Sequence, residues 1–246
     1  SWENSGPIER AGYGAPSPRT YPALAYNPLL ETVEMFGGWQ KGGKLFDDHD
    51  RWNGWDWSEV IDSDPDGDGS PIPCRMTTMN WAGTFDGANS YMVLFGGRLG
   101  SGAVLDDVWF FKDGTWTEPD IVDSTGDGDP GPRNSKSGVT YDSLRKRLVV
   151  FGRSPWTDTW ELGYHDAGTP NEGYDWRERT PVDGEGNANP SSAATLRMAY
   201  DEARERSVLY GPEKHGKNES TWEGNGISWI EKIPTDPEND GNPGSS

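Results

Sequence analysis

The 246-residue sequence predicts an all-β fold built from four repeated units. Three observations lead to this class. Short apolar runs rich in β-branched and aromatic residues recur along the chain, and glycine (33) and proline (19) are abundant between them. No long window shows the periodicity of a helix. The same short motifs also return at nearly constant spacing, which is typical of repeat proteins.

Each unit contains an apolar strand that ends in an aromatic residue followed by glycine. These pairs are Phe36-Gly37, Phe95-Gly96, Phe151-Gly152 and Tyr210-Gly211, at spacings of 59, 56 and 59 residues. The run before each pair, such as Met92-Val93-Leu94, has the composition of a buried strand. Four such pairs in phase are much stronger evidence for a repeat than any one of them.

Three further strands are expected in each unit. The strand before the apolar run carries an aromatic residue: Tyr26, Trp81, Tyr141 and Tyr200. The strand after it carries a tryptophan: Trp52, Trp109, Trp160 and Trp222. The last strand carries another: Trp57, Trp116, Trp176 and Trp229. Each unit therefore predicts four strands, and the structural role of these aromatic residues is to fill the core.

A period of about 57 residues with four strands is too long for a solenoid coil and suits one blade of a β-propeller. The expected units are residues 19–74, 75–132, 133–191 and 192–246 of a single domain. Residues 1–18 are in phase with the last strand and linker of a preceding blade. We therefore expect four blades plus an extra N-terminal strand, whose unpaired edge is a template for another chain.

These motifs resemble the kelch repeat, in which an apolar strand ends in Gly-Gly and is followed by an aromatic strand and a tryptophan. The resemblance extends over nearly the whole chain and implies a kelch-like β-propeller with four-stranded blades. Arg153 and Pro212 stand where the second glycine is expected, so the third and fourth units depart from the pattern. The sequence leaves open whether the four blades belong to a larger ring.

The net charge of −19 excludes several classes of partner. A nucleic-acid binder needs a basic face, and an anionic membrane surface would repel this chain. Cys74 is the single cysteine, so no intramolecular disulfide can form, and no apolar run of membrane-spanning length occurs. The chain begins with Ser1, which predicts that a segment upstream has been removed. A single cysteine fits a cytosolic protein and also many secreted bacterial proteins, so we base the expected extracellular or cell-surface location on the acidity and on the acidic turns.

Four acidic turns recur after the closing tryptophans and are candidate calcium sites. In the first, oxygen-bearing side chains alternate from Asp62 to Asp68 around Gly67, as at the start of an EF-hand calcium loop. Pro73 replaces the bidentate glutamate of such a loop, and ordinary turn chemistry is the competing interpretation. The candidate ligands are Asp62, Asp64, Asp66, Asp68, Asp123, Asp127, Asp129, Asp236, Glu238 and Asp240.

No catalytic residues are predicted. The three histidines lie in different units, and neither a nucleophile elbow nor a phosphate loop occurs. Tyr164-His165 and Cys74 resemble parts of the copper site of galactose-oxidase-like kelch enzymes, but the second tyrosine and histidine of such a site are not identified. A redox enzyme of that kind is therefore a minor alternative.

We expect a non-catalytic binding or structural propeller that mediates protein–protein contact or assembly. Its partner is expected to be another protein or copies of itself, and its cofactor is either calcium or none. The alternative is a carbohydrate-binding module or a glycan-active enzyme. For that alternative Trp39 and Trp156 are the candidate ligand contacts, because both stand in connections outside the repeating core pattern.

Overall fold

The computed structural model describes residues 14–62, 69–153, 156–165, 168–170, 172–182, 189–191, 196–211 and 220–233. The described strands form four antiparallel sheets of four strands each, and within each sheet the strands follow one another in chain order. The predicted all-β class with four four-stranded units is confirmed. The chain divides into two compact units, and each contains two of the sheets.

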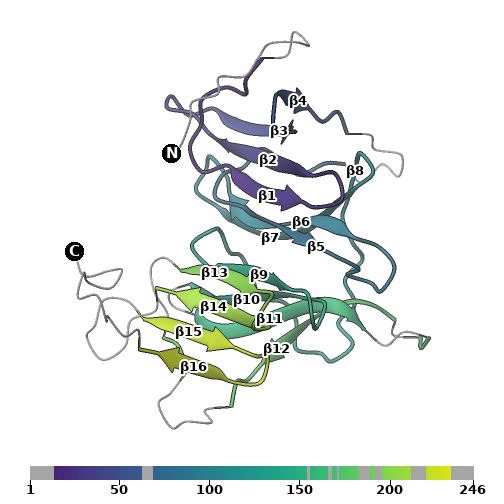
Figure 1. Cartoon of the computed structure of the whole chain (residues 1–246), viewed down its shortest axis with the longest axis vertical. Helices are drawn as coiled ribbons and strands as arrows, with labels where there is room; N and C mark the ends of the chain where they lie inside the picture. Colours follow the sequence, from purple (N-terminus) through teal and green to yellow (C-terminus); the bar gives the residue numbers. More distant parts are fainter. Residues whose placement is uncertain are drawn as a thin grey trace. The chain divides into compact units, whose positions relative to one another are not determined.

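The first unit comprises Ser1–Thr84, Ala88–Pro119 and Gly131–Asn134. Sheet 1 consists of β1 (Ala23–Asn27), β2 (Thr32–Trp39), β3 (Leu45–Trp52) and β4 (Trp57–Glu59) (Figure 1). Sheet 2 consists of β5 (Thr78–Ala82), β6 (Tyr91–Arg98), β7 (Val104–Lys112) and β8 (Thr115–Thr117). The extra strand expected within residues 1–18 falls largely on residues 1–13, which lie outside the described residues.

The second unit comprises Phe85–Gly87, Asp120–Pro130 and Ser135–Ser246. Sheet 3 consists of β9 (Gly138–Asp142), β10 (Arg147–Arg153), β11 (Trp156–His165) and β12 (Gly173–Arg179) (Figure 1). Sheet 4 consists of β13 (Arg197–Asp201), β14 (Arg206–Tyr210), β15 (Thr221–Gly224) and β16 (Trp229–Lys232).

The recurring glycine marks a β-bulge in the second strand of the first three sheets. In sheet 2 the pairing of β6 with β7 shifts register between Phe95 and Gly97. Gly96 has a φ of +59°, and a Cβ at this position would overlap the carbonyl oxygen of Arg133. The amide of Gly97 donates a hydrogen bond of 2.8 Å to that same carbonyl. Glycine is required here because the backbone conformation is left-handed and another backbone segment passes very close.

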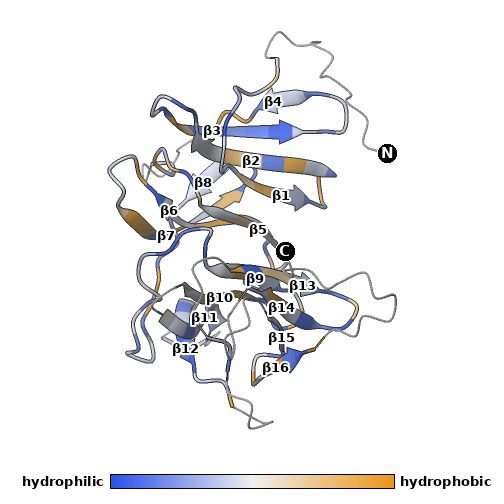
Figure 2. Cartoon of the chain, turned by 90° about the vertical axis from the view of Figure 1, so that its left-hand side faces the viewer, coloured by the Kyte–Doolittle hydropathy of each residue, from blue (hydrophilic) through white to orange (hydrophobic). Residues whose placement is uncertain are grey.

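The two sheets of each unit pack face to face through aromatic and aliphatic side chains. Successive side chains along a strand point to opposite faces, so strand β2 combines hydrophobic and hydrophilic residues (Figure 2). Phe36 of sheet 1 contacts Trp116 of sheet 2, with ring centroids 5.4 Å apart. In the second unit Phe151 of sheet 3 contacts Trp229 of sheet 4, with ring centroids 5.5 Å apart. Large rings thus supply most of the core of this polar chain.

The tryptophan pattern of the third strand is displaced in sheet 1. In sheet 2, Trp109 directly follows the residue that pairs with Phe95. In sheet 1, the position that follows the partner of Phe36 is held by Asp50. The sequence alignment of Trp52 with Trp109 was therefore wrong by two residues, because strand register and not residue type decides which positions are equivalent.

Candidate functional site

One face of sheet 1 carries exposed apolar side chains, and we call it the open face. Strand register places on it Leu24, Tyr26, Val33, Met35, Asp50, Trp52, Trp57 and Glu59. The opposite face is the one packed against sheet 2. Leu24 and Tyr26 are each 55% exposed. Trp55, in the turn at the end of this face, is 79% exposed, whereas Met35 and Asp50 on the same face are buried. Exposed apolar side chains grouped in this way are typical of an interaction surface.

Two tryptophans and a third in the adjoining turn form one end of this surface. The rings of Trp52 and Trp57 lie 5.6 Å apart at an angle of 47°. Trp55, between β3 and β4, is 79% exposed. The side-chain oxygen of Asn53 accepts hydrogen bonds of 2.9 Å from the amides of Trp55 and Asp56, so it fixes the turn. Sequence reasoning missed Trp55, although a large aromatic residue directly after an Asn-Gly turn is itself an unusual signal.

A buried charged cluster supports the open face from behind. Oε2 of Glu34 lies 2.9 Å from Nε2 of His49, and Oε1 accepts hydrogen bonds from Arg51 at 2.7 Å and Thr32 at 2.8 Å. Burial raises the pKa of Glu34, but the hydrogen bonds from His49, Arg51 and Thr32 outweigh that effect and leave the pKa below its ordinary value. The cluster therefore contains an ionised glutamate that ties β2 to β3.

Arg19 anchors the segment before β1 to the same sheet. Its guanidinium donates to both carboxylate oxygens of Asp48, at 2.5 and 2.8 Å, and lies 3.9 Å from the centre of the Phe46 ring. Nη2 also lies 3.7 Å from Asp50. A bidentate arginine–carboxylate pair of this kind is directional, so it fixes where the chain enters the sheet.

The predicted calcium ligand Asp62 lies in an acidic pocket of the first unit. The pocket has a volume of about 430 Å³, and Asp47, Asp48 and Glu59 also line it. The hydroxyl of Ser70 donates a hydrogen bond to Asp62. Within the described residues, no three histidine, cysteine, aspartate or glutamate side chains are grouped so that they could hold a metal. The remaining predicted ligands of this loop are Asp64, Asp66 and Asp68, which lie outside the described residues. Calcium binding here stays a prediction.

In the second acidic turn, carboxylates accept hydrogen bonds from other groups of the chain. Asp123 accepts a hydrogen bond of 2.8 Å from the amide of Gly126. Asp127 accepts one from the hydroxyl of Thr125 and one of 2.9 Å from the amide of Glu178 on β12. Slight burial raises the pKa of Asp127, but these hydrogen bonds lower it below its ordinary value. Asp129 lies in the same described turn, whereas Asp236, Glu238 and Asp240 lie outside the described residues.

Of the two tryptophans predicted as ligand contacts, the structure describes the side chain of one. Trp39 ends β2 and is half-buried, and the guanidinium of Arg75 lies 5.2 Å from the centre of its ring. The backbone of Trp156 begins β11, but its side chain lies outside the described residues. Sugar contact by either residue stays a prediction.

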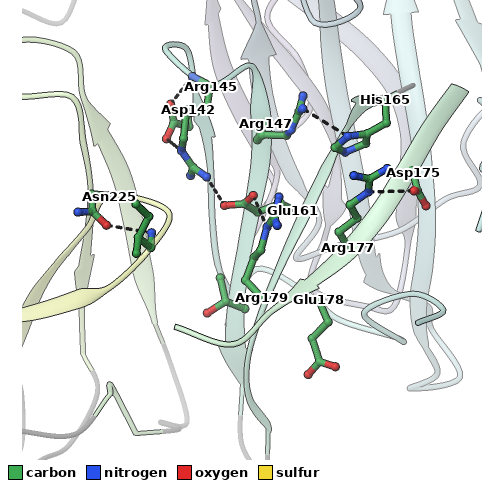
Figure 3. Close-up of polar contacts among 12 residues, drawn as sticks. Asp142, Arg145, Arg147, Glu161, His165, Asp175, Arg177, Glu178, Arg179 and Asn225 are labelled. Carbon is green, nitrogen blue, oxygen red and sulfur yellow. Dashed lines mark hydrogen bonds and ion pairs between the residues drawn. The ribbon is translucent and has the colours of Figure 1, made fainter. Parts of the chain in front are cut away.

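The residues that resemble part of a copper site make other contacts. Cys74 is buried in the core between sheets 1 and 2. Burial, together with the charge of Asp107, raises the pKa of its thiol to about 12. The hydroxyl of Tyr164 donates to Glu172, and Nδ1 of His165 lies 3.4 Å from Nη2 of Arg147 (Figure 3). These contacts make Cys74 a core residue with little thiolate at neutral pH.

A second pocket of the first unit combines an aromatic wall with polar groups. It has a volume of about 390 Å³ and lies beside the turns of sheets 1 and 2. Trp81, Asn89 and Lys112 line it together with Arg51, whose Nε donates to Glu34. Aromatic faces next to amide and cationic donors are the usual ingredients of a small polar-ligand site.

Comparison with known proteins bears on the fold alone. No family model matches the chain, and no curated protein matches its sequence. The solved structure of YjhT, a kelch-like propeller protein, is similar at 12% sequence identity with a TM-score of 0.54. That match covers 87% of this chain and 70% of YjhT.

A fructofuranosidase from Schwanniomyces occidentalis complexed with fructose matches at 12% identity and a TM-score of 0.43, over 86% of this chain and 45% of the enzyme. At that TM-score the likeness supports no argument about this chain. Within the described residues, no helix has the length and apolar character that crossing a membrane requires. The similarity to YjhT and the four four-stranded antiparallel sheets show that the chain has the all-β architecture of a β-propeller.

Proposed function

We propose that the chain is a kelch-repeat propeller that binds protein without catalysis, and that the open face of sheet 1 is its binding surface. The observation that carries the proposal is the exposure of two large apolar side chains on that face and of a tryptophan in the turn at its end. Leu24, Tyr26 and Trp55 together offer aliphatic and aromatic contacts of the kind that dominate protein interfaces. The net charge and the acidic turns favour a location outside the cell or at its surface.

The construction of sheet 1 suits a rigid binding surface. The open face is backed by the Glu34–His49–Arg51 cluster and held at its edge by the Arg19–Asp48 pair. A backbone that is already held in a regular sheet loses little conformational freedom on binding, which favours affinity.

Site-directed photocrosslinking tests this function. A photoreactive phenylalanine analogue replaces Tyr26 on the open face, and the matched control replaces Leu144, which is 58% exposed in the β9–β10 turn of sheet 3. After irradiation in extract of the source cells, position 26 should form discrete crosslinked protein bands and position 144 should not. Equal or absent crosslinking at the two positions would reject the proposed surface, whichever protein is captured.

Carbohydrate binding is a second candidate, favoured by the pocket beside Trp81. An aromatic wall with Asn89 and Lys112 nearby can stack on a sugar ring and donate hydrogen bonds to its hydroxyls. A glycan array probed with the wild-type chain and with Trp81→Ala distinguishes the two candidates. Binding that is lost in Trp81→Ala would support the sugar site, and the absence of glycan binding would remove it.

A further inference from the structure

Sheet 3 carries a charged cluster on the face that it turns toward sheet 4. Nε of Arg145 donates to Asp142 at 2.8 Å, and Nη1 of the same arginine donates to Glu161 (Figure 3). Nε of Arg179 donates to the other oxygen of Glu161 at 2.8 Å. Asp142 and Glu161 are both buried. Burial of these carboxylates is tolerated because each is paired and hydrogen-bonded.

Sheet 4 covers this cluster with one turn and one tryptophan. The β15–β16 turn lies so close that a Cβ on Gly226 would overlap the guanidinium of Arg145. Next to it, the ring of Trp229 packs on Phe151, and its Nε1 donates to Oγ1 of Thr159 at 3.4 Å. The junction between sheets 3 and 4 therefore includes a glycine turn on an arginine cluster and a tryptophan on an aromatic ring, beside the apolar contacts of Leu196, Leu209 and Trp222.

Sheet 4 repeats the arginine cluster on its other face. Nε of Arg204 donates to Asp201 at 2.8 Å, and its Nη1 donates to Glu223. Lys232 takes the place of the second arginine and lies 3.3 Å from Glu223. The side chain of Arg204 is 56% exposed, compared with 27% for Arg145. The cluster that sheet 3 buries is thus exposed on sheet 4.

The β3–β4 turn of sheet 1 has the same hydrogen bonds as the β15–β16 turn that covers the Arg145 cluster. Asn53 accepts hydrogen bonds of 2.9 Å from the amides of Trp55 and Asp56. In the β15–β16 turn, Asn225 accepts two hydrogen bonds of 2.9 Å from the amides at the same two positions. The backbone of each turn is also closed by a bond of 3.3 Å, from the amide of the asparagine to the carbonyl three residues later.

The glycine and tryptophan of the junction have counterparts in sheet 1 as well. Gly54 has a φ of +95° and Gly226 a φ of +84°, so the two turns share their left-handed position. Among the residues that the structure describes, a Cβ on Gly54 would meet nothing within 4 Å. Trp57 opens β4 as Trp229 opens β16, and each pairs with the last residue of the preceding strand. The β3–β4 turn of sheet 1 therefore resembles the β15–β16 turn that covers the arginine cluster, but its glycine contacts none of the described residues.

The two surfaces are also complementary in charge. The acids that this end of sheet 1 offers to a partner are Glu59 on the open face and Asp56 in the turn, because Asp50 is buried and lies 3.7 Å from Nη2 of Arg19. In the β13–β14 turn of sheet 4, Glu202 accepts a hydrogen bond from Ser143 of the β9–β10 turn. Apart from Glu202, the cations on the outer face of sheet 4 and in its β13–β14 turn outnumber the acids by four to three: Arg197, Arg204, Arg206 and Lys232 against Asp201, Glu205 and Glu223. Opposite charges on two such surfaces steer their encounter and fix their orientation.

We propose that the open face of sheet 1 binds the outer face of sheet 4 of a second copy of this chain. The β3–β4 turn would lie on the Arg204 cluster, and Trp57 would pack against Tyr210 and Thr221, the counterparts of Phe151 and Thr159. The proposal rests on the proposed function, since it uses the same open face and names the occupant. Two different surfaces meet in this contact, so it is head-to-tail and each added copy offers a further site.

Sedimentation of the purified chain and of two single variants tests the proposal. Gly54→Asn adds a side chain whose Cβ meets none of the described residues within 4 Å but which would collide with Arg204 in the proposed contact. Gly42→Asn, at a φ of +114° and with no described residue within 4 Å, is its control. Arg204→Glu reverses the central cation, and Lys41→Glu, an exposed lysine in the β2–β3 turn, is its control. We expect the wild type and both controls to gain mass with concentration, and each variant to associate at least about tenfold more weakly.

Mixing the two variants gives the decisive result. Gly54→Asn keeps an intact sheet 4 face and Arg204→Glu keeps an intact sheet 1 face, so the mixture should form a one-to-one dimer that grows no further. A monomeric wild type, variants that associate normally, or a mixture that stays monomeric would each overturn the proposal. If position 26 nevertheless crosslinks a different protein in extract, the proposed function stands while the second copy is rejected.

Discussion

Nε2 of His49 lies 2.9 Å from Oε2 of Glu34, and both side chains are buried within sheet 1. Arg51 and Thr32 complete the set of donors around this carboxylate. A buried carboxylate with this many donors stabilises the fold only while it is ionised, so the contact links the stability of sheet 1 to pH.

Glu34→Gln should lower the free energy of unfolding by about 2 kcal/mol at neutral pH, because the charged hydrogen bonds to His49 and Arg51 are lost. The folded-state pKa of Glu34 lies below its ordinary value of 4.5. Its ionisation therefore contributes stability above that value, and the contribution is lost as the pH falls through the folded-state pKa. Urea unfolding should show the difference between wild type and variant shrinking in acid. Glu31→Gln, at an exposed position, is the control, and a pH-independent difference would contradict the prediction.

Trp116→Ala should remove about 3 to 5 kcal/mol of unfolding free energy from the first unit. Trp116 is 1% exposed, and its ring lies 5.4 Å from that of Phe36 and 5.0 Å from that of Phe111. Trp55→Ala, at an exposed tryptophan of the same unit, should change stability by less than about 0.5 kcal/mol. Chemical unfolding of both variants measures the contrast, and comparable losses would show that Trp116 is not a core residue.

Gly96→Ala should destabilise the chain more than Gly131→Ala. Both glycines have nearly the same left-handed φ, +59° and +61°, so the backbone cost of about 1 kcal/mol is shared. A Cβ on Gly131 meets nothing within 4 Å, whereas one on Gly96 overlaps the carbonyl of Arg133. The difference between the two melting temperatures therefore measures the close approach at the bulge. Equal shifts would mean that only the backbone conformation matters there.

Calcium binding by the acidic turns stays a prediction that thermal unfolding can test. If Asp62 and its neighbours bind calcium, excess calcium should raise the melting temperature by several degrees, and chelator should abolish the rise, because a ligand of the native state stabilises it by mass action. Asp123→Ala should lower the melting temperature in calcium and in chelator alike if this residue serves the turn, as its hydrogen bond to Gly126 indicates. Unchanged melting of the wild type on addition of calcium would contradict the metal site.

The repeat in the sequence predicted the sheets well because each motif has a local physical cause. Gly96 is needed by a bulge, and Trp116 fills the space between two sheets, so both recur wherever the local structure recurs. Trp52 was misplaced because residue type alone does not report strand register. The Asn-Gly turn at Asn53 determines where β4 begins, and a register argument based on it would have corrected the alignment.

The candidate site was predicted far less well, because it depends on which face of a sheet is covered. Leu24 and Tyr26 look like ordinary strand residues, and only their register with β2 places them together on the open face. Trp39 stands outside the core pattern in sequence, yet it is half-buried beside Arg75. In the Arg145 cluster and in the Arg204 cluster, a turn arginine joins two acids on separate strands, so the likeness of the two clusters is recognised only when those strands are paired.

Each sheet is one uninterrupted stretch of chain whose strands pair only with their sequence neighbours. A nascent chain leaving the ribosome can therefore complete the hydrogen-bonded ladder of one sheet before the next is synthesised, and only short loops need to close. The backbone contact at the bulges of sheets 1 and 2 is the exception. The amide of Gly38, for example, can donate its hydrogen bond only after Cys74, the acceptor, has been synthesised. Duplication of a gene segment that encodes one repeat unit would add a whole sheet together with the segment before its first strand, which completes the bulge of the preceding sheet.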